Sequence, residues 1–92
     1  MLTFQEKREH LLNVLLRAES LSTVEKMVAI AMVFKIQDNG VVDLRMTEIA
    51  SLSSLTVRGL RDVLKRLNQK IDLDIRGGVS RNTYYFVQWR ML

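Results

Sequence analysis

The sequence contains no cysteine and no proline, and its only histidine is His10. Without cysteine neither a disulfide nor a thiolate metal site can form, and one histidine cannot complete a zinc site. The longest apolar run, Met27–Phe34, has eight residues, whereas a membrane-spanning helix needs about 20. Residues 1–10 are too charged for a secretory signal peptide. We therefore expect a soluble, cytoplasmic protein that holds no metal ion and does not enter a membrane.

Groups suited to catalysis are present but not arranged for it. His10 lies between Glu9 and Leu11, which favours a surface or interface position over a catalytic base. Gly77-Gly78 lacks the spacing of a phosphate-binding loop. The carboxylates of the second half have no neighbouring base with which to share a proton (Glu48, Asp62, Asp72 and Asp74). The sequence thus predicts no enzyme, no catalytic residue and no cofactor.

The excess of positive over negative charge lies in the second half of the chain. Of 92 residues 48% are apolar, as in a folded domain, and we expect residues 1–92 to form one. Residues 1–40 carry five basic and five acidic side chains, whereas residues 41–92 carry nine basic and five acidic ones, so the net charge of +4 comes from that half. This asymmetry favours a polyanionic partner.

Local patterns predict a mainly helical α+β fold. Thr3 to Glu6 and Ser22 to Glu25 have the form of capping boxes, which predicts helices reaching about residues 19 and 37. Asp38-Asn39-Gly40 is expected to close the second helix. The remaining expected elements are a short strand at Val41–Leu44, helices at 46–52 and 56–68, and strands at 71–75 and 83–89. The predicted order is α-α-β-α-α-β-β.

Residues 46–67 form the most informative stretch, read as a helix, a tight turn and a second helix. Its four apolar residues at helical spacing predict a buried side for the second helix (Leu60, Val63, Leu64 and Leu67). At about 100° per residue, Arg58, Arg61 and Lys65 fall within an arc of roughly 60° on the opposite side. A helix that is apolar inward and cationic outward, entered through a short polar turn, is typical of proteins that insert a helix into the DNA major groove.

The two C-terminal strands are expected to form a hairpin around Gly77-Gly78. A two-residue turn would pair Arg76 with Val79, Ile71 with Tyr84, and Asp74 with Arg81 as an exposed ion pair. One face of this hairpin would then meet the helices (Ile71, Leu73, Ile75, Tyr84 and Phe86). The other face would carry Tyr85, Val87 and Trp89.

These features together resemble a winged helix–turn–helix domain of the bacterial, phage and plasmid regulator type. Ile49-Ala50 matches the Leu-Ala pair of the first helix of the motif, and Leu55-Thr56 matches its Leu-Ser turn. Leu60, Leu64 and Leu67 match the anchors of the recognition helix, and Ile71–Trp89 matches the wing. Two positions depart from the pattern: Ser54 stands where glycine is usual, and no glycine follows the recognition helix. The resemblance implies binding to double-stranded DNA.

Within that interpretation each cationic residue receives an expected role. Arg58 and Arg61 would contact base edges, and Lys65 and Arg66 would contact phosphates. Thr56 would cap the helix and leave its first N–H groups free for a phosphate. The full predicted DNA-binding set, wing residues included, is Ser54, Thr56, Val57, Arg58, Arg61, Lys65, Arg66, Arg76, Arg81 and Asn82. The alternative is an ordinary solvated surface, which Asp62 within the cationic segment favours slightly.

The first two helices carry more apolar surface than one small core requires. Residues 27–34 are apolar nearly all round, which predicts a buried central helix. For residues 1–20 we expect a helix that binds a second copy or a partner protein. The predicted interface consists of Leu11, Leu12, Leu15, Leu16 and Trp89. The alternative is that this helix packs on the sheet of its own chain.

The sequence therefore predicts a dimeric transcriptional regulator that recognises a specific DNA sequence and associates with the nucleoid. One alternative is a phage or plasmid protein that marks a replication origin or a partition site. The other is an adaptor that uses the same fold to bind protein only.

Overall fold

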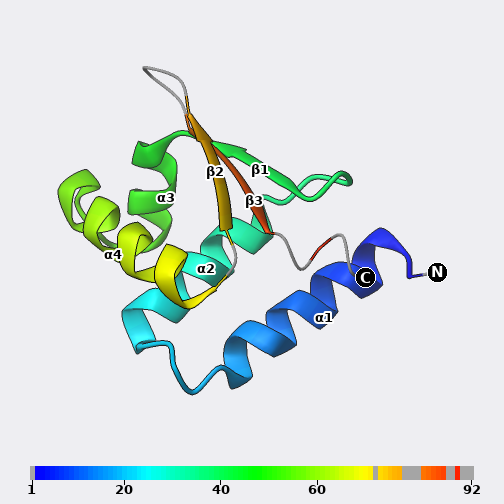
Figure 1. Ribbon diagram of the computed structural model, residues 1–92. Coiled ribbons are helices and arrows are strands. Elements are labelled where there is room, and N and C mark those ends of the chain that lie inside the picture. Colours follow the sequence, from blue (N-terminus) through cyan, green and yellow to red (C-terminus); the bar gives the residue numbers. More distant parts are fainter. Residues whose placement is uncertain (1, 72, 78–81, 87–88, 90–92) are drawn as a thin grey trace.

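A computed structural model of the chain describes residues 2–71, 73–77, 82–86 and 89 (Figure 1). Four helices account for most of its regular structure, which confirms a mainly helical fold with a small β component. The elements in chain order are α1 (Phe4–Arg17), α2 (Thr23–Phe34), β1 (Val41–Leu44), α3 (Met46–Leu52), α4 (Val57–Lys70), β2 (Leu73–Gly77) and β3 (Asn82–Phe86).

Both predicted capping boxes are present. The Thr3 hydroxyl accepts a hydrogen bond from the Glu6 N–H at 3.2 Å, and the Glu6 carboxylate accepts one from the Thr3 N–H. Ser22 and Glu25 exchange the same pair of bonds at the start of α2. Each box satisfies N–H groups that the first turn of a helix leaves without a partner, so both helices begin where the sequence indicates.

Helix α2 ends at Phe34, three residues before the expected end, because the chain turns into the sheet. Ile36 forms a β-bridge with Val42 across the turn. Gly40 has a φ of 83°, a left-handed conformation that glycine adopts without steric cost. The segment 38–40 therefore makes the bend of a short hairpin, whereas it was expected to terminate the helix.

The three strands form an antiparallel sheet in the order β1-β3-β2, with β3 in the centre. Ile75 pairs with Tyr84 and Gly77 pairs with Asn82, so residues 78–81 connect the strands. The three predicted pairs, Ile71–Tyr84, Asp74–Arg81 and Arg76–Val79, are therefore wrong, since Asp74 lies opposite Tyr85 and Arg76 lies opposite Thr83. The new register differs from the expected one by an even number of residues, which leaves the side chains on the same faces.

Consistent with this face assignment, Tyr84 and Phe86 are buried in the core. One cluster of buried side chains joins all four helices to β1 and β3. The packing of α1, α3 and α4 around α2 accounts for most of the contacts between helices. Across the described part of the chain, no helix has both the length and the apolar character needed to cross a membrane.

The structure corrects the predicted role of helix α1. Leu11 and Leu15 belong to the core of their own chain, and so does Trp89, which is only 3% exposed. The Trp89 ring lies 5.7 Å from the Phe4 ring, and the Lys7 ammonium lies 5.6 Å from its centre. These three predicted interface residues are thus unavailable to a second copy. Of the other two, Leu12 is half-buried and Leu16 remains 55% exposed.

Candidate nucleic-acid interface

The turn between α3 and α4 is tight because Ser54 adopts a left-handed conformation. Its φ is 55°, and the following Leu55 N–H donates to the Ala50 carbonyl at 2.8 Å. A side chain at such a φ costs about 1–2 kcal/mol, which glycine avoids. The position that the family pattern assigns to glycine therefore does have the conformation that favours glycine.

We expect Ser54→Gly to raise the free energy of unfolding by about 0.5–1 kcal/mol, because relief of backbone strain outweighs the greater freedom of the unfolded chain. Ser54→Val should lower it by about 1–2 kcal/mol, since a β-branched side chain tolerates a positive φ poorly. Urea unfolding of the three proteins measures both changes. Equal stabilities would show that the turn relaxes to another conformation.

Helix α4 begins at the predicted cap and extends further than expected. The Thr56 hydroxyl accepts from the Gly59 N–H at 3.0 Å. The helix reaches Lys70, and Ile71 leaves it in an extended conformation while its N–H donates to the Leu67 carbonyl at 2.8 Å. The chain therefore leaves the helix without the usual glycine. Thr56 and Ser54 are exposed and Val57 is half-buried.

The two sides of α4 differ as the sequence predicts. Leu60, Val63, Leu64 and Leu67 are buried. Arg58, Arg61 and Lys65 are exposed and lie along one wall of a groove of about 380 Å³ between α4 and the sheet. The floor includes Tyr84, whose hydroxyl donates to the Met46 sulfur at 3.0 Å. We call this feature the α4 groove.

Two further polar residues of α4, Asp62 and Asn68, also line the α4 groove. Among the described residues, Asp62 forms no ion pair with the neighbouring cations. A carboxylate in this position can accept a hydrogen bond from the amino group of cytosine, and an amide can bond to adenine. The groove therefore combines cations with groups that can discriminate between bases.

Arg66 is placed differently from the prediction. Its Nε donates to the Glu25 carboxylate at 3.2 Å, and the Lys70 ammonium donates to the same carboxylate at 2.8 Å. Glu25 lies on α2 and is only 1% exposed. Arg66 therefore points toward α2, away from the α4 groove, and we assign it a structural role in place of the predicted phosphate contact. Neither ion pair could be predicted from the sequence, because the paired residues are more than 40 positions apart.

Glu25 is held in its charged form by these partners. The hydrogen bond from Lys70 lowers its pKa most, followed by the backbone N–H of Ser22, with a smaller contribution from Arg66. Burial acts in the opposite direction, and the net result is a pKa of about 2 against an ordinary value of 4.5. The carboxylate thus links the start of α2 to the last turns of α4.

Because the pKa of Glu25 is lower in the folded chain than in the unfolded one, its contribution to stability is complete above about pH 4.5. It is lost as the pH falls from 4.5 toward 2. We expect the melting temperature of the wild-type protein to fall through this range, and that of Glu25→Gln to fall less. Glu48→Gln removes an exposed carboxylate as a control. Parallel curves for wild type and Glu25→Gln would contradict the prediction.

Of the three residues predicted for the wing, the structure describes Arg76 and Asn82. Arg76 lies in β2 opposite Thr83, and Asn82 is opposite Gly77 in the last described pair before the connection. Arg81 lies outside the described residues. The ends of β2 and β3 that carry Gly77 and Asn82 lie on the side of the sheet away from α1 (Figure 1).

Comparison of the chain with models of protein families, with curated proteins and with solved structures gives no match in any of the three.

Proposed function

We propose that this chain is a winged-helix protein that binds a specific sequence of double-stranded DNA and regulates transcription from it. The observation that supports this most directly is the arrangement of α4. Four buried side chains fix one side of the helix, and Arg58, Arg61 and Lys65 are exposed on another. Such a helix can enter the major groove without disturbing the core.

The roles of the cations follow from their positions along α4. Arg58 and Arg61 lie in its first half, the part that contacts base edges in helix–turn–helix proteins, and a guanidinium can donate to O6 and N7 of guanine together. Lys65 lies further along and suits a phosphate, which adds affinity without sequence preference. The β2–β3 hairpin would contact the flanking backbone.

Selection from random DNA duplexes at low and moderate salt tests the proposal. We expect an enriched sequence motif and an affinity that falls as salt rises, because bound cations release counterions from DNA. No binding even at low salt would contradict the proposal and would favour a protein-binding adaptor. An origin-binding or partition protein would also enrich a motif, but its genomic sites would form clustered repeats.

A further inference from the structure

Helix α2 has one apolar side that the described part of its own chain leaves largely exposed. Its segment 27–34 is apolar throughout, which predicts burial on all sides. In the structure, however, Met27 is 45% exposed and Phe34 is 60% exposed, and half-buried Ile30 lies between them. Together with Ala31 they have the spacing i, i+3, i+4, i+7, which places them on one stripe of the helix.

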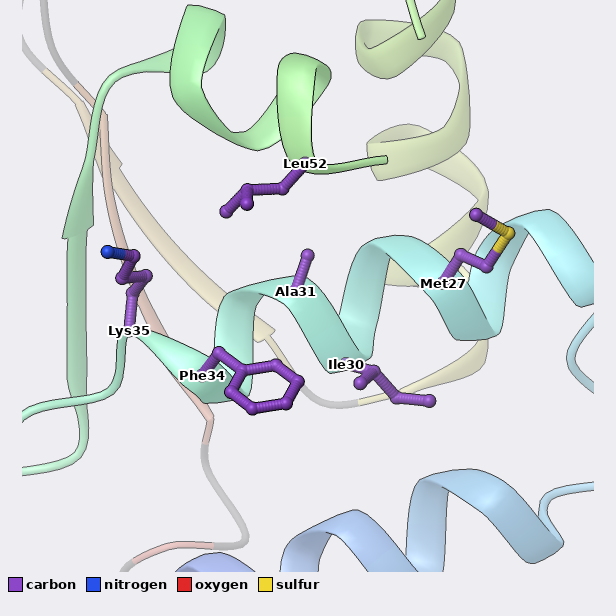
Figure 2. Close-up of a pocket in the computed structure, with 6 residues that line it drawn as sticks. All are labelled: Met27, Ile30, Ala31, Phe34, Lys35 and Leu52. Atoms are coloured by element: carbon purple, nitrogen blue, oxygen red, sulfur yellow. The ribbon is translucent and has the colours of Figure 1, made fainter. Parts of the chain in front are cut away.

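This stripe lines a groove of about 540 Å³, which we call the α2 groove (Figure 2). Leu52 at the end of α3 approaches it from the other side and is 53% exposed. The described residues of the lining are Met27, Ile30, Ala31, Phe34, Lys35 and Leu52. On the side of α1, the Arg8 guanidinium lies 5.3 Å from the centre of the Phe34 ring and borders the groove.

The character of the α2 groove excludes two kinds of occupant. Among the described residues of its lining, Lys35 is the only charged one and none is shared with the α4 groove, so nucleic acid is not favoured here. A small molecule needs a site that buries most of its surface. Met27, Phe34 and Leu52 are each about half exposed, so the groove is too open to provide one. A protein surface remains.

We infer that the α2 groove binds a second copy of this chain, with the two α2 helices antiparallel about a two-fold axis. The stripe is complementary to itself in that arrangement. Met27 of one copy would lie opposite Phe34 of the other, a favourable contact of sulfur with an aromatic ring. Ile30 and Ala31 would lie at the axis, where the small alanine side chain permits close approach.

The apolar area of the stripe favours this occupant. Side chains of this size and exposure present on the order of 400 Å² of apolar surface. A stable interface buries about 800 Å² per partner, and in homodimers about 65% of it is apolar. The exposed side chains of the stripe and Leu52 supply a substantial share of that apolar part.

Sedimentation of the full chain without DNA, from about 1 to 100 µM, tests the inference independently of the proposed function. We expect the wild-type protein to dimerise within this range. Phe34→Glu and Leu52→Glu should each weaken dimerisation at least ~10-fold, because they bury a charge in an apolar interface. Val14→Glu is the matched control, since Val14 is 46% exposed but lies outside the α2 groove.

The absence of native cysteine allows a second test of the geometry. Ile30→Cys would place one thiol near the proposed axis, and mild oxidation should give a covalent dimer on a non-reducing gel, whereas Val14→Cys should not. A wild-type protein that stays monomeric at 100 µM would overturn the inference. So would dimers that persist in both glutamate variants, or an Ile30→Cys protein that does not cross-link.

Discussion

Arg58→Ala and Arg61→Ala should each weaken binding of the selected duplex by ~1–3 kcal/mol, or roughly 5- to 150-fold. Both side chains are exposed on the wall of the α4 groove, in the half of α4 that we propose to contact bases. Each variant should also lose the preference for one base of the motif. Titration of the selected duplex and of duplexes with one base changed measures both effects.

Arg66→Ala is the matched control, since it removes the same charge from the same helix. Its guanidinium is directed toward Glu25, so we expect a much smaller loss of affinity and no change in base preference. If Arg58→Ala weakens binding to all duplexes equally, Arg58 contacts phosphate only. If all three variants bind like the wild-type protein, α4 is not the DNA-binding element.

Trp89→Ala should lower the free energy of unfolding by about 3–5 kcal/mol, a large part of the 5–15 kcal/mol typical of a domain. Trp89 follows β3 in the chain and is 3% exposed, and its ring lies against Phe4 and Lys7 of α1. Removing the indole would leave a cavity between these elements. For a chain of this size the melting temperature should fall by at least about 12 °C.

The dependence on protein concentration distinguishes the two roles considered for Trp89. If it packs within its own chain, the loss caused by Trp89→Ala should be the same at low and high concentration. Trp89→Phe should restore much of the stability, because a ring would still meet Phe4. A loss of stability that appears only at high protein concentration would show that Trp89 lies in an interface between two copies.

The predictions that succeeded depend on short segments of the chain. A capping box involves residues three apart, and the two sides of α4 follow from the helical period, so Thr3, Ser22 and Thr56 could be identified directly. The burial of Tyr84 and Phe86 was also predictable, because alternation along a strand depends only on parity.

The errors arose where distant segments decide the outcome. The turn at Gly77-Gly78 was expected to fix the hairpin register, but the pairing of β3 with both β1 and β2 places the connection at residues 78–81. Arg66 directly follows Lys65 in the sequence, so both were expected to contact phosphates. Only the fold shows that the buried carboxylate of Glu25 on α2 lies beside Arg66. Trp89 could not be placed without knowing that Phe4 and Lys7 of α1 lie against its ring.

The central strand of the sheet is also the last of the described strands in chain order, which affects how the protein folds during synthesis. β1 and β2 are synthesised before residues 82–86, the segment to which both bind. On the ribosome, the helices can therefore begin to pack while both outer strands still lack partners. Closure of the sheet must bring together residues about 40 positions apart, so we expect it to be slower than the packing of the helices.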